Sequence, residues 1–208
     1  GDVYKRQPLH FPIAMAALKA GKHVYCEWPL AMNSKEAAEM AALAKRQGLY
    51  NAVGTQGRFT PAVMYAKHLI EEGYVGRSLL FNLTQFLPTS IESRQSDRRL
   101  SLNADQGGGA LNIAAGHSID TLISTLGAVR SVMGHTDTLI DETKFTDTME
   151  TVAITATDTV TLMARLESGI LGSIHVRNVC RYGSGFRLEV YGTEGRIMIQ
   201  APRWIQYS

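Results

Sequence analysis

The segment that most constrains the fold is a strand, a helix and a second strand joined by short connections. Short apolar runs predict buried strands over residues 23–26 and 49–53, and the pattern between them predicts a helix over 35–47. Ser34 is expected as the N-cap of this helix, and Gly48 follows its last residue. Two strands joined by a helix in this way form a right-handed parallel crossover. The sequence therefore predicts an α/β fold that contains a doubly wound parallel sheet.

Beyond residue 60 the pattern changes from alternating helices and strands to successive strands. Thr60 and Pro61 begin a helix that is expected to run to Glu72, and residues 111–126 are expected to form another helix. Strands are expected over 77–87, 131–140, 151–157, 159–167, 170–180 and 186–199, with a hairpin-like break at 192–195. Strands that follow one another without intervening helices favour an α+β arrangement with a mostly antiparallel sheet.

Composition and charge exclude several classes of partner. The 208 residues include 21 basic and 19 acidic side chains that are interspersed, so no basic patch indicates a nucleic acid or an anionic membrane. No apolar run reaches the roughly 18 residues that would cross a bilayer. No secretory signal pattern is present, which favours the cytoplasm. Cys26 and Cys180 lie in segments of different character, so reduced thiols are expected and no metal site is indicated.

Polar side chains follow both strands of the predicted crossover, at the point where each strand ends. Glu27, Trp28 and Pro29 come directly after the first strand, and Gln56 and Arg58 follow the second. Open α/β sheets bind their ligands at the carboxyl ends of the strands. We therefore expect these residues to face a binding site, although Arg58 could instead cap a helix or form a salt bridge.

A run of three glycines leads into the predicted helix at 111–126. Spacing of three or four residues places Ile113, His117 and Asp120 on one helix face. His117, with an ordinary pKa near 6.5, could accept the proton of an alcohol, although a lone histidine on a helix is often a structural residue. Asp120 is expected to be a partner that positions the helix. No P-loop lysine follows the glycines, so they are interpreted as a tight, closely packed turn.

The stretch Ala-Gly-Lys-His-Val-Tyr-Cys-Glu-Trp-Pro-Leu-Ala, at residues 20–31, resembles the signature of the glucose-fructose oxidoreductase and inositol dehydrogenase (Gfo/Idh/MocA) family. The resemblance extends over about residues 8–87 and implies NAD or NADP as cofactor and a sugar or polyol as substrate. It also implies dimers or tetramers formed through the open sheet face. The sequence departs from the family pattern at two positions, because the family has lysine where Trp28 stands and aspartate where Ile113 stands. Neither replacement can transfer a proton.

The resemblance assigns a domain to each part of the chain. Residues 1–56 correspond to part of a Rossmann-type dinucleotide-binding domain, and residues 57–208 to an α+β substrate and oligomerisation domain. The sequence contains no Gly-x-Gly-x-x-Gly between a strand and a helix, so we expect a fragment that lacks this fingerprint. Residues 1–7 are expected to be a foreign or misread end, and the second domain is expected to be truncated at its C-terminus within a strand.

The resemblance also implies roles for individual residues. His117 is the expected catalytic base, and Arg58 and Asp120 are expected at the substrate. His10 could instead be a surface residue at a helix start. The residues expected to bind the cofactor are Pro8, His10, Glu27, Trp28, Pro29 and Gln56.

Two functions remain open from the sequence. The first is an NAD(P)-dependent oxidoreductase of sugar metabolism, in which the cofactor carries the hydride and His117 accepts the proton. The second is a catalytically degenerate NAD(P)-binding regulator, because the branch that the Glu-Trp-Pro-Leu stretch resembles includes the fungal galactose-regulon repressor. Trp28 and Ile113 favour the regulator, since a sensor needs no proton transfer.

Overall fold

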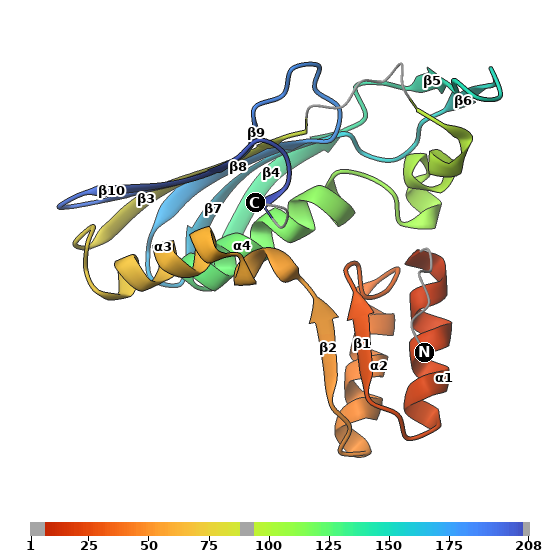
Figure 1. Cartoon of the computed structure of the whole chain (residues 1–208), viewed down its shortest axis with the longest axis horizontal. Coiled ribbons are helices and arrows are strands. Elements are labelled where there is room, and N and C mark those ends of the chain that lie inside the picture. Colours follow the sequence, from red (N-terminus) through yellow and green to blue (C-terminus); the bar gives the residue numbers. More distant parts are fainter. Residues whose placement is uncertain (1–6, 88–93, 206–208) are drawn as a thin grey trace.

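The computed structural model describes residues 7–87 and 94–205. Its first unit consists of a short 3-10 helix (Gln7–Leu9), α1 (His10–Lys19), β1 (Val24–Glu27), α2 (Ser34–Arg46) and β2 (Asn51–Gly54). The two strands pair in parallel, with Val24 opposite Asn51 and Glu27 opposite Gly54. Figure 1 shows this unit as one arm of the molecule, with the two strands beside α1 and α2. The predicted parallel crossover is therefore confirmed.

The N-cap of α2 differs from the expected one. Asn33, and not Ser34, caps the helix, because its side-chain oxygen accepts a hydrogen bond of 2.9 Å from the backbone N–H of Glu36. The Glu36 carboxylate in turn accepts from the backbone N–H of Met32. Both residue types suit the N-cap position, and the sequence alone did not distinguish between these neighbours.

The strands of this unit are less buried than expected. In β1 only Cys26 is buried, and in β2 only Gly54. Helices α1 and α2 share one apolar cluster, against which Val24 of β1 packs, so both cover the same face of the sheet. The described residues supply no layer for the other face, and this explains why the apolar pattern overestimated the burial.

The second unit is a six-stranded sheet in the order β10-β9-β3-β8-β7-β4. Only β3 and β8 pair in parallel, so the expectation of a mostly antiparallel sheet is confirmed. The segment 186–199 forms two strands, as the predicted break implied. The strands are β3 (Ser78–Phe86), β4 (Val129–Asp137), β7 (Thr159–Leu166), β8 (Leu171–Arg177), β9 (Gly185–Gly192) and β10 (Arg196–Ala201).

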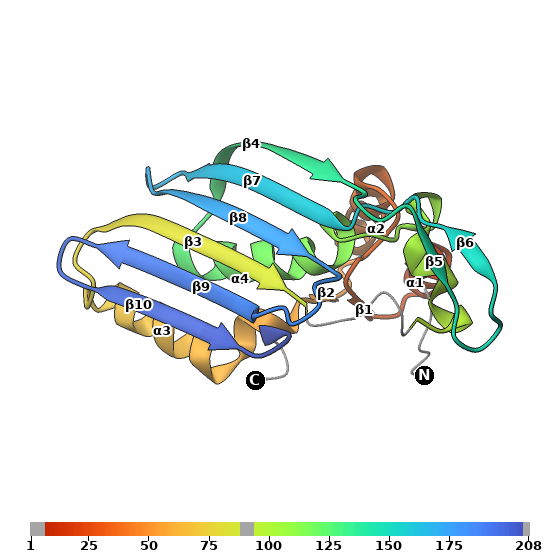
Figure 2. The ribbon, with the colours of Figure 1, turned by 90° about the horizontal axis from the view of Figure 1, so that it is seen from above.

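Both long helices of this unit cover the same face of the sheet. These are α3 (Pro61–Glu71) and α4 (Gly116–Leu126), and Figure 2 shows the opposite face uncovered. The main core lies between the helices and the sheet, where Phe81, Leu83, Leu122 and Phe186 are fully buried. The alternating residues of the strands point to the other face, which is therefore open.

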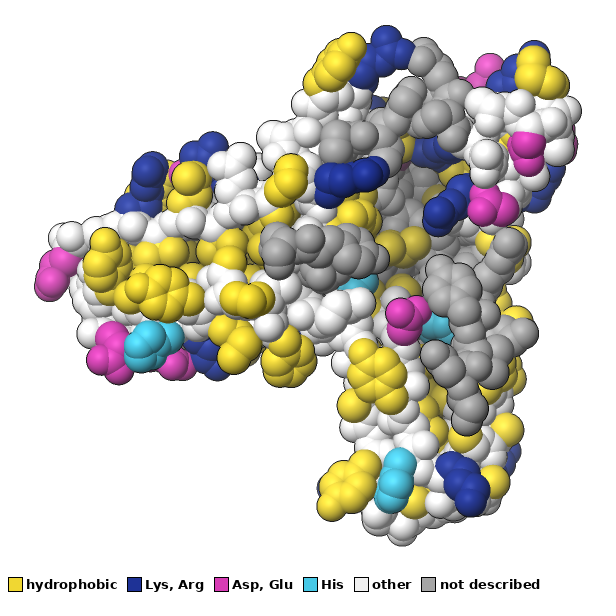
Figure 3. All heavy atoms as spheres, in the orientation of Figure 1, with side chains coloured by type: hydrophobic (Ala, Val, Ile, Leu, Met, Phe, Trp, Pro, Cys, Tyr) yellow, Lys and Arg dark blue, Asp and Glu magenta, His cyan; other side chains and the backbone are white. Residues whose placement is uncertain are grey.

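Apolar side chains also remain exposed beside the edge strand β10. Tyr65 and Tyr74, at the α3 side, and Met198 of β10 line a shallow groove of about 550 Å³. Figure 3 shows apolar side chains gathered over this part of the molecule. None of the helices in the described ranges is both long and apolar enough to cross a membrane.

A small arm projects beyond the sheet and was only partly predicted. Strands β5 (Glu142–Lys144) and β6 (Thr151–Ala153) form a hairpin beside two 3-10 helices, η4 (Ser96–Leu102) and η5 (Ala104–Gln106). A strand was expected over 151–157, but β6 ends at Ala153. The backbone N–H of Ile154 still donates to the carbonyl of Asp141, but those of Thr155 and Ala156 donate to the carbonyl of Leu102, which turns the chain away from the hairpin.

Candidate functional site

A cavity of about 410 Å³ lies where the carboxyl end of β1 meets the second unit. Figure 1 shows β1 ending below the segment that carries η4 and η5. One side of the cavity is lined by Gln7, Pro8, His10, Glu27, Trp28 and Pro29, and the other by Asp97, Arg98, Leu100, Ser101, Gln106, Gly108 and Ile113. The structure thus brings together all the residues expected at the cofactor except Gln56, which is exposed and stays a prediction.

The end of β1 is held in place by a contact from the start of α1. His10 Nδ1 lies 2.7 Å from the carbonyl oxygen of Pro29. A carbonyl can only accept, so this nitrogen must carry the proton. Pro29 itself is buried, whereas Glu27 is exposed. The contact fixes the loop that presents Glu27 and Trp28 to the cavity.

The side chain of Trp28 crosses from the first unit to the second. Its indole N–H donates a hydrogen bond of 2.7 Å to the carbonyl oxygen of Asn112. The ring lies against Gly116, where a Cβ atom would overlap the indole. The single donor of the indole is therefore already used inside the protein.

The glycine run is a tight turn, as expected. Gly107 and Gly109 have positive φ angles of 75° and 114°, which other residues rarely adopt. A Cβ atom on Gly108 would collide with the carbonyl of Ser101. The turn leads into the π-helical segment Leu111–Ala115 and then α4, so the predicted helix over 111–126 has a widened first turn.

His117 lies in α4, buried beside the cavity rather than among its lining residues. Its Nδ1 atom is buried and has no hydrogen-bond partner, and its ring meets Trp204 edge-on at 6.0 Å between centroids. Burial lowers the pKa of His117 below its ordinary value, and the negative charges of Asp120 and Glu27 oppose this shift. The imidazole is therefore favoured in its neutral form, the form that can accept a proton.

Arg58 and Asp120 contact each other. Arg58 Nε donates to Asp120 Oδ2 at 2.9 Å, and a second guanidinium N–H donates to Oδ1. This hydrogen-bonded pair raises the pKa of Arg58. The pair joins the 3-10 helix Gln56–Phe59 to α4, so the salt-bridge interpretation of Arg58 and the positioning interpretation of Asp120 are both seen in the structure. Substrate binding by either residue stays a prediction.

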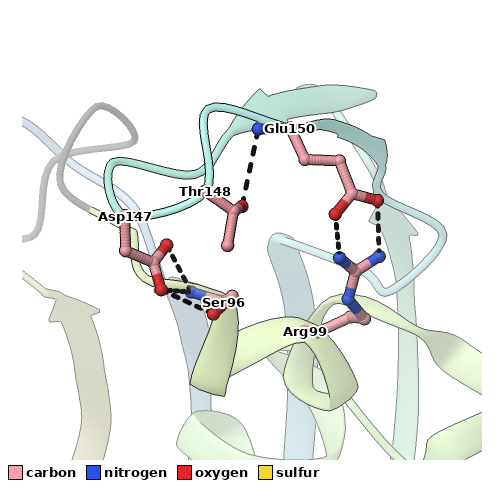
Figure 4. A network of polar contacts seen from close by, with 5 residues as sticks. All are labelled: Ser96, Arg99, Asp147, Thr148 and Glu150. Carbon is pink, nitrogen blue, oxygen red and sulfur yellow. Dashed lines mark hydrogen bonds and ion pairs between the residues drawn. The ribbon is translucent and has the colours of Figure 1, made fainter.

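Sequence reasoning missed the cavity wall formed by Asp97, Arg98 and Ser101. The polar composition of this segment gave no periodic signal. Its position depends on contacts with residues about fifty positions later, in the hairpin of β5 and β6. Ser96 bonds to Asp147, and Arg99 pairs with Glu150 through two hydrogen bonds (Figure 4). Such pairing cannot be read from local sequence.

Comparison with known proteins agrees with this geometry. Residues 3–55 match the model of an oxidoreductase family with an NAD-binding Rossmann fold, and residues 63–198 match the C-terminal domain of the GFO/IDH/MocA family. A levoglucosan dehydrogenase from Pseudarthrobacter phenanthrenivorans is 32% identical over 97% of this chain and 55% of its own length. An inositol 2-dehydrogenase/D-chiro-inositol 3-dehydrogenase from Lactiplantibacillus plantarum is 25% identical over 89% of the chain and 48% of its own length.

Solved structures give the same result. A levoglucosan dehydrogenase in complex with NADH and levoglucosan superposes with a TM-score of 0.85 at 31% identity, over 96% of this chain and 53% of that one. An NAD-binding oxidoreductase from Klebsiella pneumoniae superposes with a TM-score of 0.84 at 30% identity and the same coverage. The chain spans about half the length of the relatives that it matches. On the strength of the two family matches and the fold, the chain belongs to the GFO/IDH/MocA oxidoreductase family.

Proposed function

We propose that this chain supplies the nicotinamide and substrate side of an NAD(P)-dependent oxidoreductase that acts on a sugar, a polyol or a related hydroxyl or carbonyl compound. The observation that carries the proposal is the cavity at the end of β1, where Glu27, Trp28 and Pro29 meet residues of the second unit. The relatives named above include dehydrogenases of levoglucosan and inositol, which supports the substrate class. We assign the cofactor contacts to residues 1–56 and the substrate contacts to residues 57–208.

The residues around the cavity fit the nicotinamide end of the cofactor. The cavity has apolar walls, from Pro8, Trp28 and Ile113, and polar groups such as Glu27, which suits a flat ring with an amide. His117, whose Nδ1 atom is buried and unpaired, follows Gly116, the residue on which the Trp28 indole rests. When bound, a nicotinamide accepts or gives the hydride. The sequence has no glycine fingerprint, so the described residues offer no comparable site for the pyrophosphate.

Within this proposal His117 takes the proton of the substrate hydroxyl. Burial keeps its imidazole neutral and ready to accept a proton near pH 7. The pairing of Arg58 with Asp120 holds α4, which carries His117, against the 3-10 helix Gln56–Phe59 that follows β2. Trp28 and Ile113 have no titratable group, so their contribution to the cavity is shape.

A second function is favoured by these same two residues. A cavity lined by Trp28 and Ile113 can hold a cofactor without any proton transfer. A regulator that binds NAD(P) and reports its presence to a partner protein would need nothing more. This second proposal keeps the cofactor site and removes the turnover.

Turnover and binding measurements distinguish the two proposals. A protein that contains this chain is titrated with NADH and NADPH by tryptophan fluorescence and then screened with sugars and polyols for a change in nicotinamide absorbance. His117→Ala should reduce kcat by roughly 10²-fold or more while cofactor binding persists. His68→Ala, at an exposed histidine of α3, is the control and should leave both unchanged. Binding without turnover on any substrate supports the regulator, and absence of binding contradicts both proposals.

A further inference from the structure

Trp28 connects two elements that lie far apart in the sequence. It stands at the end of β1, and the carbonyl that its indole N–H contacts, at Asn112, follows 84 residues later. The same indole contributes to the cavity wall. A change in this contact would therefore alter both the docking of the two units and the shape of the cavity between them.

The acceptor of this hydrogen bond lies in a helix with an unusual first turn. In a regular α-helix the N–H of Gly116 would donate to the carbonyl of Asn112. Here the turn Leu111–Ala115 is π-helical, and the N–H of Gly116 points to the carbonyl of Ile113 instead. The N–H of Ala115 donates to the carbonyl of Ala110, five residues earlier. The widened turn thus leaves the Asn112 carbonyl accessible to a donor from outside the helix.

Gly116 provides the surface on which the indole rests. A Cβ atom at this position would overlap the Nε1, Cε2 and Cζ2 atoms of Trp28. Glycine inside a helix is destabilising relative to alanine, so a glycine here is explained by the close approach of the ring. The π-helical turn frees the carbonyl that accepts the indole hydrogen bond, and the glycine leaves room for the indole ring to pack.

We propose that Trp28 is a positioning residue that fixes the first unit against the π-helical turn and so sets the geometry of the cavity. The contact itself is independent of the proposed function, and only its expected effect on ligand binding rests on that function. Because the indole N–H is donated to Asn112, the residue offers the cavity ring surface and no hydrogen-bond donor. Its loss should weaken ligand binding and leave proton transfer at His117 largely intact.

The contact can be tested without any enzymatic activity. The full chain labelled with ¹⁵N has two tryptophans, Trp28 and Trp204, and hence two indole N–H signals, which Trp28→Phe assigns. The Trp28 indole proton should exchange with water at least about tenfold more slowly than in free tryptophan. Gly116→Ala should remove this protection and shift the signal. Gly195→Ala, where a Cβ atom meets nothing closer than 3.3 Å, is the control and should leave both signals in place.

Two results would overturn the inference. One is a Trp28 indole proton that exchanges in the unchanged chain as fast as in free tryptophan. The other is a Gly116→Ala variant whose Trp28 signal keeps its position and protection. If Gly116→Ala fails to fold, Trp28→Phe still tests the inference through ligand binding, since it keeps a six-membered aromatic ring and removes the five-membered ring that carries the N–H.

Kinetics then test the consequence for binding. In an active protein that contains the chain, Trp28→Phe should raise KM or the cofactor Kd several-fold, on the order of one lost hydrogen bond, with kcat changed by no more than about twofold. A fall in kcat at constant KM would instead place Trp28 in the chemical step and contradict a positioning role. The exchange measurement stands even if no substrate is found, so its failure and the failure of the proposed function are distinguishable.

Discussion

His117 sits in α4 with a buried, unpaired Nδ1 atom, and this burial lowers its pKa in the folded chain. In the unfolded chain the pKa of His117 has the ordinary histidine value of about 6.5. The folded state therefore binds fewer protons than the unfolded state as the pH falls below that value. By linkage, this site contributes stability above pH 6.5 that is lost progressively as the pH falls through the lowered pKa.

The corresponding prediction concerns the pH dependence of unfolding. His117→Gln should lose less of its free energy of unfolding between pH 7.5 and pH 5 than the unchanged chain. Histidine changes its charge between about pH 5 and 8, whereas glutamine does not titrate. Urea denaturation midpoints at a series of pH values measure this. His68→Gln, exposed on α3, serves as control and should retain the original slope. Parallel slopes for His117→Gln and the unchanged chain would contradict the lowered pKa.

The neighbouring residue in α4 allows a test of a different kind. The hydroxyl oxygen of Ser118 is buried and has no hydrogen-bond partner. Removing an unsatisfied buried polar group releases its desolvation cost, so Ser118→Ala should raise the free energy of unfolding by about 1 kcal/mol. Ser124→Ala, which removes a hydroxyl that donates to the Thr121 carbonyl, should give no such gain. Urea denaturation measures both, and a destabilised Ser118→Ala would show that the hydroxyl has an unseen partner.

At the scale of elements, the segment η4 owes its position to the hairpin of β5 and β6. Ser96 bonds to Asp147, and Arg99 pairs with Glu150 through two hydrogen bonds, as Figure 4 shows. The Arg99 guanidinium lowers the pKa of Glu150, and hydrogen bonds from Ser96 lower that of Asp147. Both contacts are exposed to solvent, so they contribute little to the stability of the whole chain. We expect their main effect on the local order of η4.

Glu150→Gln should therefore loosen η4 without unfolding the chain. Without the charged pair, the bonds after Arg98 and Arg99 should be cut by trypsin faster, by roughly a few fold, because cleavage reports local opening. Mass spectrometry of the first fragments measures the effect. Glu142→Gln, on β5 of the same hairpin, is the matched control and should be cut at the original rate. Equal cleavage rates in the two variants would mean that packing alone holds η4.

The same elements show what the sequence could and could not predict. The positions of Glu27, Trp28 and Pro29 follow from local pattern, since a short apolar run fixes where a strand ends. The tight turn at residues 107–109 was likewise a local property of glycine. The wall formed by Asp97 and Arg98 depends on pairing across the chain, as does the contact of Trp28 with Asn112. Periodicity and capping rules contain no information on such contacts.

At the scale of the whole molecule, the two units form two arms (Figure 1). The cavity is lined by residues of both units. Helices α3 and α4 cover one face of the large sheet. The other face is open and carries exposed apolar side chains. Met133 on β4 lies opposite Met163 on β7, and Leu80 on β3 lies opposite Leu171 on β8. Ser173 and Arg165 lie between the two pairs on this face, which therefore combines apolar and polar side chains. A sheet face that no helix covers is available for association with another chain.

We propose that two copies of the chain associate through this open face, related by a twofold axis. In such an interface each residue occurs twice, so one substitution buries two new charges, one on each copy. Met163→Glu should therefore convert a dimer into a monomer, which sedimentation velocity at about 10–50 μM would detect, a range suited to micromolar affinity. Met64→Glu, on α3 at the covered side of the sheet, is equally exposed and should leave the dimer intact. A monomeric unchanged chain, or a Met163→Glu variant that remains dimeric, would show that the open face has another role.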